Sequence, residues 1–355
     1  MADEEAPGQD WRSVETRAAD HHALGTARKR AAEPGRGRDA TRPEEIPSRG
    51  WVDILWRVIG SIPQDRVSAT AGGVAFFALL AVFPGLATVV SLYGLFADVT
   101  TMSRHLTLLT GILPSGVLDL LAQEMGRIAG KSTPTLSTAF LVSFAIAFWS
   151  ANSGSIALFD ALNVIYKERE KRSLVRLYGT TFLFTLGAIG FGVAATTAVV
   201  VIPVLLNLVG LTSFSDRLLS IARWPILLIL VVLGLALIYR YGPSRHEAKR
   251  RWVIWGSALA TLLWMLGSMA FSWYVASFDS YNRTYGSLGA GVGFMTWMWL
   301  SIVIVLLGAE LNSEMERQTA RDTTECQPKP IGSREAYAAD TVGKAIGQGQ
   351  RRVTS

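Results

Sequence analysis

The chain has 355 residues, 50% of them apolar, with 34 basic and 28 acidic side chains and a net charge of +6. A soluble domain of this length does not gather its apolar residues into long uncharged runs, so the composition excludes a soluble domain and indicates a membrane protein. The positive charge lies mostly in loops, where it meets anionic lipid headgroups, and a nucleic-acid partner is not needed to explain it.

The first 50 residues contain nine basic and ten acidic side chains and almost no large aliphatic ones. We predict a disordered tail over residues 1–50 and a second one over residues 319–355 on the same grounds. The first tail has no apolar stretch of the kind found in a cleavable signal sequence. Apolar side chains then recur at helical spacing and predict a short interfacial amphipathic helix: Trp51, Ile54, Leu55, Val58, Ile59 and Ile62.

Six apolar segments follow, and each can cross a bilayer as a helix, for which about 20 residues suffice, the shortest with help from its flanking arginines, which reach the interfaces. Five of them contain no charged residue, and the remaining one lies between Arg223 and Arg240. We therefore predict an all-α integral membrane protein whose membrane domain covers residues 51–318. Its six transmembrane helices are expected at about residues 71–97, 136–159, 179–209, 221–240, 252–277 and 286–310.

The charges of the loops predict how these helices are oriented. Residues 167–176 carry five basic side chains against two acidic ones, and residues 240–251 carry five against Glu247, so both loops are expected in the cytoplasm. An even number of crossings then separates them, and the long segment 177–215 is interpreted as one span and a loop. Residues 98–131 balance three basic with three acidic side chains and are expected outside, as a helical hairpin over the bundle. Both termini are then cytoplasmic.

Five motifs, in order along the chain, are similar to those of a known family. They are AGGVAFF at residues 71–77 with Phe83-Pro84, ALNVIY at 161–166, YRYGP at 239–243, Tyr281 with TYGSLGA at 284–290, and GAELN at 308–312. With them, residues 51–318 resemble the YihY/virulence factor BrkB family. The resemblance implies a six-helix protein of the bacterial inner membrane, described in different members as a serum-resistance factor, a transporter or, by an older label, a ribonuclease.

The residues themselves do not support the ribonuclease label. Hydrolysis of a phosphodiester needs a cluster of metal-binding carboxylates or a positioned pair of histidines. His21, His22, His105 and His246 are spread over a tail, an outer segment and an inner loop, so they are not expected to converge. The sequence also has no HExxH or Walker motif. We expect no enzymatic activity, no metal and no cofactor.

Polar residues within the second span form the first candidate site, because lipid makes them costly unless they face the bundle or a water-filled cavity. Asn152, Asp160 and Asn163 share one side of this helix, with Tyr166 following at its inner end. They predict part of a substrate pathway. Hydrogen bonding between helices, with Asp160 as an interfacial charge, is the alternative.

The second candidate is Glu310 with Asn312, at the inner end of the last span after 26 uncharged residues. Glu310 is expected to pair with Arg172 or Arg240 across the inner mouth. If so, it holds the helix ends together or switches their spacing. A solvated helix end is the simpler alternative.

At the outer side, Tyr281, Arg283 and Tyr285 combine a cation with aromatic rings at headgroup level. They predict either contact with a ligand or an ordinary aromatic belt. Small residues open the sixth span, and others occur in the first, where they predict close helix packing or a kink that exposes the backbone. These residues are Gly286, Gly289 and Gly293 in the sixth span, and Gly72, Gly73 and Pro84 in the first.

Two functions remain. The first is a transporter or flippase that moves an amphipathic lipid or envelope precursor without ATP, the headgroup passing from Tyr281, Arg283 and Tyr285 to an inner cluster of Asn163, Arg172, Arg240 and Glu310. The alternative is a non-transporting scaffold for envelope assembly. The expected partners are membrane lipids, with anionic headgroups at the cytoplasmic loops, and the sequence leaves a homo-oligomer open.

Overall fold

The computed structural model of the protein describes residues 24–96, 133–196, 214–277, 287–325 and 327–347. Within these ranges the chain is helical, and its only extended pairing is a single antiparallel bridge between Ala248 and Thr324. Apolar segments of a membrane protein fold this way because lipid offers no partner for backbone polar groups, so each helix must satisfy its own. The long helices are α3 (Val67–Phe96), α6 (Thr133–Tyr166), α7 (Leu174–Thr196), α9 (Phe214–Tyr241), α10 (Arg250–Ser277) and α12 (Ser287–Glu316).

Five of these helices contain a segment that is long and apolar enough to cross a membrane, and α9 contains a shorter one at Pro225–Tyr241. The all-helical membrane fold expected from the sequence is therefore confirmed, with five candidate spans in the described residues. The candidate spans are Val67–Gly85, Phe140–Tyr166, Leu174–Ala195, Arg250–Tyr274 and Gly291–Glu316. The outer hairpin predicted at residues 98–131 and the end of the predicted third span lie outside the described residues.

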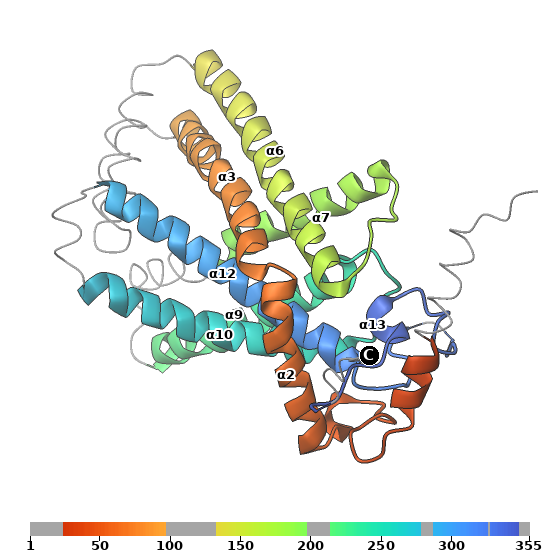
Figure 1. Ribbon diagram of the computed structural model, residues 1–355. Helices are drawn as coiled ribbons and strands as arrows, with labels where there is room; N and C mark the ends of the chain where they lie inside the picture. Colours follow the sequence, from red (N-terminus) through yellow and green to blue (C-terminus); the bar gives the residue numbers. More distant parts are fainter. Residues whose placement is uncertain (1–23, 97–132, 197–213, 278–286, 326, 348–355) are drawn as a thin grey trace, which may run out of the picture.

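The helices converge at one end and spread apart toward the other (Figure 1). At the end where the helices converge, α12 is central, because it packs on α2, α3, α6 and α10. Helix α7 packs on α6, and α9 packs on α10. The buried apolar side chains belong mainly to this convergence, for example Ala161 in α6, Tyr239 in α9 and Leu306 in α12. Away from it, large apolar side chains such as Trp149 and Leu183 are exposed, as expected for surfaces that face lipid.

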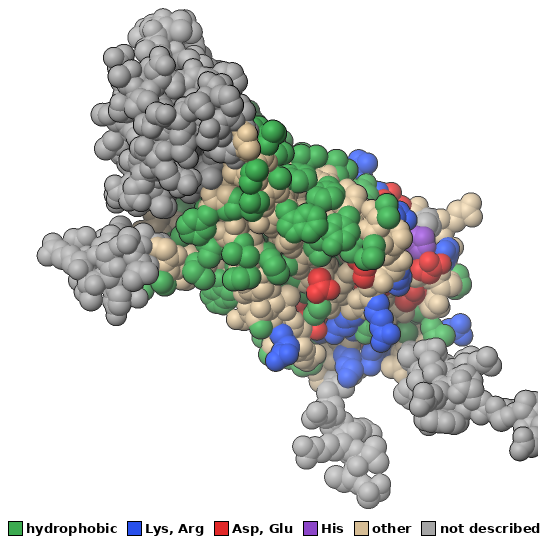
Figure 2. Space-filling view, turned by 90° about the horizontal axis from the view of Figure 1, so that it is seen from above, with side chains coloured by type: hydrophobic (Ala, Val, Ile, Leu, Met, Phe, Trp, Pro, Cys, Tyr) green, Lys and Arg blue, Asp and Glu red, His purple; other side chains and the backbone are tan. Residues whose placement is uncertain are grey.

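Charged side chains gather at the end where the helices converge, while apolar ones cover the middle of the visible surface (Figure 2). This charged end holds the α6–α7 loop, the α9–α10 loop and the end of α12. Residues 24–47 and 317–347 also lie there, with the short helices η1 (Pro43–Glu45) and α13 (Tyr337–Asp340). The basic loops identified in the sequence therefore lie at one end of the bundle.

The described parts of the two tails are packed, unlike the disorder predicted for residues 1–50 and 319–355. Arg38 is 2% exposed and donates hydrogen bonds to the carbonyl oxygens of Gln318, at 3.1 Å, and Gly343, at 2.8 Å. Arg334 likewise donates to the carbonyl oxygens of Ala339 and Lys329. The prediction is wrong for residues 24–50 and 319–347 because buried arginines bound to backbone carbonyls hold them, and a count of large apolar residues does not detect such contacts.

A helix, α2 (Ser48–Gln64), lies where the interfacial helix is predicted. Its buried face is largely polar and includes Asp53, Arg57 and Ser61. Arg57 donates to the Glu314 carboxylate at 2.5 Å and to the Gln318 side chain at 2.8 Å. The opposite face leaves apolar side chains exposed, namely Val52, Leu55, Trp56 and Ile59. The helix therefore turns its polar side to the protein and its apolar side outward.

The closest approach between helices occurs at glycines that differ from the predicted ones. A Cβ atom on Gly256 of α10 would collide with the carbonyl oxygen of Gly308 of α12, and one on Gly308 would lie 2.7 Å from the Gly256 carbonyl oxygen. By contrast, a Cβ on Gly72, Gly73 or Gly293 would meet no atom within 4 Å among the described residues. The packing role expected for these three glycines is therefore not found, since they lie on open helix surfaces.

Pro84, Gly286 and Gly289 are the other residues for which close packing or a kink was predicted. Helix α3 continues through Pro84 to Phe96, and the Thr88 hydroxyl donates to the Pro84 carbonyl oxygen at 2.8 Å. The helix is thus not broken at Pro84, and its backbone is not opened toward a substrate there. Gly289 lies in α12, and Gly286 lies outside the described residues.

Candidate functional site

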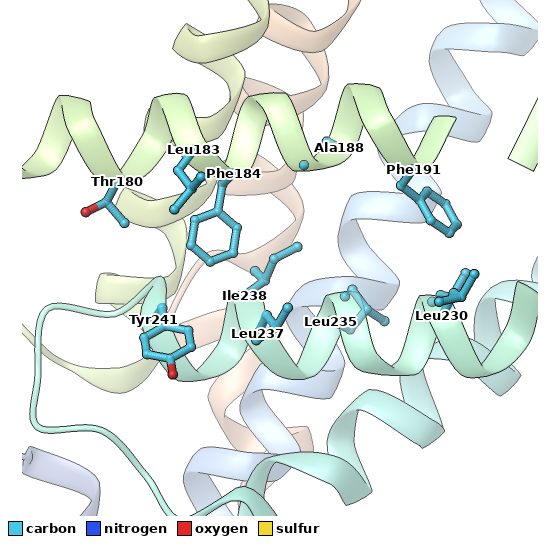
Figure 3. Close-up of a pocket in the computed structure, with 13 residues that line it drawn as sticks. Thr180, Leu183, Phe184, Ala188, Phe191, Leu230, Leu235, Leu237, Ile238 and Tyr241 are labelled. Carbon is cyan, nitrogen blue, oxygen red and sulfur yellow. The ribbon is translucent and has the colours of Figure 1, made fainter. Parts of the chain in front are cut away.

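An apolar groove of about 650 Å³ separates α7 from α9 (Figure 3). Gly187 and Ala188 of α7 and Gly234 of α9 leave the space that larger side chains would fill. Apolar side chains of both helices point into it, and its polar lining is slight. Its other lining residues are Thr180, Leu183, Phe184, Phe191, Leu230, Val231, Leu235, Leu237, Ile238 and Tyr241.

At the charged end the groove lies next to a second, polar pocket of about 380 Å³, and Thr180 and Tyr241 line both. Five Lys or Arg residues and two Glu residues line this basic pocket, and carboxylates in or next to the lining pair with four of the five cations. Its other lining residues are Lys171, Arg172, Arg176, Arg240, Pro243, Ser244, Arg245, His246, Glu247 and Glu335. The arrangement thus places an apolar groove next to a pocket rich in charged side chains.

The α6–α7 loop fixes Arg172 in this pocket. Its guanidinium binds the Glu170 carboxylate through two contacts of 2.7 Å. It also donates to the carbonyl oxygens of Tyr241, at 3.1 Å, and Gly242, at 2.8 Å, where α9 has ended and its last carbonyls need partners. Arg172 therefore holds the loop against the end of α9, and one of its tasks is structural.

Asn163 belongs to the same network, as the sequence predicted for the inner cluster. It is 4% exposed. Its Oδ1 accepts a hydrogen bond from the Ser244 backbone at 2.7 Å, and its Nδ2 donates to Glu170 at 3.1 Å. Both ends of the amide are thus engaged, and Asn163 ties α6 to the α9–α10 loop behind the pocket lining.

Arg240 contacts two carboxylates, and neither is Glu310. It donates to Glu247 at 2.8 Å and to Glu325 at 2.9 Å. The expected pairing of Glu310 with Arg172 or Arg240 is therefore wrong. Each arginine is bound by carboxylates from its own loop or from the C-terminal segment, and the latter could not be foreseen because residues 319–355 were predicted to be disordered.

Arg245 and Glu316 form a fully buried ion pair, although the sequence marks Arg245 only as a loop charge and does not single out Glu316. Both side chains are 0% exposed, and the guanidinium contacts the carboxylate at 2.7 and 2.9 Å. The Arg245 guanidinium also lies 4.2 Å from the centre of the Tyr166 ring, and the Thr323 hydroxyl donates to Glu316 at 3.0 Å. The pair joins the α9–α10 loop to the end of α12 and forms the floor of the basic pocket.

Asn312 holds α12 against α10. Its Oδ1 accepts a hydrogen bond from the Gly256 backbone at 2.9 Å, and its Nδ2 donates to the Val253 carbonyl oxygen at 3.2 Å. Glu310 is 1% exposed but lies outside the basic pocket, and its Oε1 has no hydrogen-bond partner among the described residues. The two residues predicted as one candidate thus have different surroundings.

The other predicted site residues lie in different surroundings. Asn152 is buried and accepts a hydrogen bond from Thr185 at 3.5 Å, which ties α6 to α7, whereas Asp160 is exposed and does not join it. Tyr166 is buried beneath Arg245. The outer residues Tyr281, Arg283 and Tyr285 lie outside the described part of the chain. In that part no three His, Cys, Asp or Glu side chains approach closely enough to hold a metal ion.

Electrostatics favour an ionised Glu170. Burial would raise the pKa of its carboxyl, but the hydrogen bonds from Arg172 and Asn163 outweigh this effect and lower the pKa from 4.5 to about 2. The carboxylate therefore stays charged at any pH at which the basic pocket would bind an anion. It neutralises part of the Arg172 charge and fixes the position of that guanidinium.

Replacing Glu170 with glutamine is expected to remove an acid-sensitive contribution to stability. Because the folded-state pKa is lowered, this contribution is present above pH 4.5 and is lost as the pH falls from 4.5 toward 2. It is expected to be small, since the group is partly exposed and solvent screens it. Unfolding midpoints measured against pH should converge for the two proteins at the acid end. Asp39→Asn, at a carboxylate 89% exposed, is the control, and a constant difference across the range would contradict the prediction.

Comparison with known proteins gives a consistent result. The family model described as virulence factor BrkB matches residues 58–332. The chain is 28% identical over 258 residues to the ribonuclease-like protein YfkH of Bacillus subtilis, covering 69% of this chain and 88% of that protein. It is 27% identical over 290 residues to a UPF0761 membrane protein of Cronobacter sakazakii, covering 79% and 94%. No solved structure matches.

Proposed function

The chain belongs to the virulence factor BrkB family of membrane proteins, and we propose that it moves an anionic amphipathic lipid or envelope precursor across the bilayer along the groove between α7 and α9. The observation that carries this proposal is that the apolar groove and the basic pocket lie side by side, with Thr180 and Tyr241 lining both. One molecule with an acyl chain and an anionic headgroup can occupy both.

The chemistry of the two parts suits such a molecule. Each methylene group that leaves water gains about 0.8 kcal/mol, but a chain already in lipid gains little, so the groove provides a path and little affinity. Selectivity then comes from the edge of the pocket, where Arg176 can bind phosphate or carboxylate oxygens through paired hydrogen bonds, because the carboxylates of the protein already hold Arg172, Arg240 and Arg245. Lys171 and Arg176 are exposed at its edge and are the first cations that a headgroup would meet.

In this proposal the charged end faces the cytoplasm of a bacterium and both termini lie there, because the excess of Lys and Arg in its loops favours that side. The short apolar segment of α9, Pro225–Tyr241, crosses the bilayer as the fourth of six spans in chain order. The exposed apolar face of α2 rests in the membrane interface, with Trp56 and Ile59 toward the acyl chains. Tyr281, Arg283 and Tyr285 remain the predicted outer contact.

The transport test uses headgroup-labelled anionic lipid and purified protein in proteoliposomes. Gly234→Trp should slow lipid movement at least tenfold, which corresponds to about 1.4 kcal/mol, because the indole fills the groove. Gly73→Trp is the matched control: both glycines have no atom within 4 Å of a Cβ, but Gly73 is exposed on α3, away from the groove. Equal rates for the two variants would contradict the groove as the pathway.

The alternative is a scaffold that binds lipid without moving it. Arg176→Gln distinguishes the two functions when binding and movement of the same labelled lipid are both measured. A transporter should lose both together, whereas a scaffold should show lipid binding and no protein-dependent movement in any variant. Loss of the preference for anionic over zwitterionic lipid in Arg176→Gln would support the basic pocket as the headgroup site.

A further inference from the structure

Two carboxyl groups meet near the end of α12, and neither belongs to the lining of the basic pocket. Asp65 lies in the turn between α2 and α3, and Glu310 lies in the last turns of α12. The Asp65 side chain is 11% exposed and Glu310 is 1% exposed, and their carboxyl groups face each other within hydrogen-bonding reach. Two carboxylates cannot accept a hydrogen bond from each other unless one of them carries a proton.

The surroundings do not neutralise two negative charges. Glu310 Oε1 and Asp65 Oδ2 are both buried, and neither has a hydrogen-bond partner among the described residues. Lys167 is the cation that faces them, but its Nζ lies 3.9 Å from Asp65 Oδ1 and its side chain is 33% exposed. Glu314, on the same helix, repels a second negative charge but is itself paired with Arg57 and Arg317, and the Tyr166 hydroxyl from α6 is uncharged. A buried charge without a close partner is strongly unfavourable, so this pair requires a bound cation.

We propose that Asp65 and Glu310 form a proton-binding site that holds one proton between them. A proton taken from water would form an O–H bond on one carboxyl, which then donates a hydrogen bond to the other and leaves a single net negative charge opposite Lys167. A sodium ion fits less well, because hard cations prefer several oxygen ligands. Here two carboxylates lie beside an ammonium group that repels a metal ion.

The site is placed where gaining or losing the proton would move helices. Helix α12 packs on α2, α3, α6 and α10, and the turn that holds Asp65 continues into Arg66, whose φ of 50° leaves little freedom for local adjustment. Loss of the proton would make the two carboxylates repel and push the α2–α3 turn from α12. The link between this movement and lipid transport rests on the proposed function, whereas the proton site does not.

Infrared spectroscopy of the full-length protein in lipid nanodiscs tests the site directly. Wild-type protein should show the C=O band of a protonated carboxyl at neutral pH, where exposed Asp and Glu are ionised, and the band should disappear on alkaline titration. Asp65→Asn and Glu310→Gln should each remove the band, since each leaves one carboxyl next to an amide that can donate to it. Asp160→Asn, at an exposed position on α6, should retain it.

The same infrared measurement can also contradict the proposal. Absence of the band from wild-type protein, or its persistence in both substituted proteins, would overturn the proposal. Displacement of the wild-type band by sodium chloride but not by choline chloride would assign the site to sodium instead. If one variant fails to fold, as judged by its thermal unfolding, the other decides alone. A band without pH-dependent lipid movement would retain the site and remove only its link to transport.

Discussion

The substitution Arg245→Gln is expected to destabilise the folded protein by about 3–5 kcal/mol, the usual cost of leaving one member of a buried ion pair without its partner. Arg245 and Glu316 are both 0% exposed, so the substitution leaves the Glu316 carboxylate buried without its charged partner. Burial lowers the pKa of Arg245, but the charge of the Glu316 carboxylate outweighs this and raises it, so the guanidinium is charged. The loss should appear as a lower unfolding midpoint in detergent solution.

An exposed ion pair provides the control. Arg321 lies 3.7 Å from Asp39, with the two side chains 64% and 89% exposed, so Arg321→Gln should cost less than about 1 kcal/mol. The double substitution Arg245→Met with Glu316→Leu should restore much of the stability lost in Arg245→Gln, because it removes both buried charges. Equal losses of stability for Arg245→Gln and Arg321→Gln would show that the buried pair contributes no more to stability than the exposed one.

The second large effect is expected for Gly256→Ala, where one methyl group would be forced against the Gly308 carbonyl oxygen and the Asn312 side chain. The Gly308 oxygen belongs to the backbone and cannot rotate away, so α10 and α12 must separate. Overpacking of this kind costs about 1–3 kcal/mol and occasionally more. The hydrogen bond from the Gly256 backbone to Asn312 would also lengthen.

The same substitution at an open position should have the opposite sign. Gly293→Ala on α12 meets no atom within 4 Å, and alanine in a helix is more stable than glycine by about 0.5–1 kcal/mol. In one detergent, the thermal unfolding midpoint of Gly256→Ala should therefore lie below that of the wild-type protein, and the midpoint of Gly293→Ala above it. Destabilisation by Gly293→Ala as great as that by Gly256→Ala would mean that the contact between α10 and α12 is not what limits the size of residue 256.

The sequence predicted the membrane helices well because an uncharged apolar run reports directly on a lipid-facing helix. It placed residue boundaries less well: α6 continues through Asp160 to Tyr166, since a helix does not end where its membrane-embedded part ends. The inner cluster was predicted in part. Asn163 and Arg172 both bind Glu170, and Arg240 lines the same pocket as Arg172.

The sequence could not predict which side chains the charged residues contact. Glu310 faces Asp65 rather than an arginine, and Arg240 binds Glu325 from a segment that was expected to be disordered. The pattern of α2 likewise predicted an amphipathic helix but could not tell that its polar face would be buried, since this depends on the distant Glu314. Spacing along the chain gives the face on which a residue lies, whereas tertiary packing decides what it meets.

The contacts of Arg38 also set an order of events during biosynthesis. This residue leaves the ribosome among the first, while its partners Gln318 and Gly343 are 280 and 305 residues further along the chain. A chain emerges at about 5–20 residues per second, so the N-terminal segment waits many seconds with its guanidinium in water. The charged end can close only after translation is nearly complete, and a protein fused directly after residue 347 would compete with that final step.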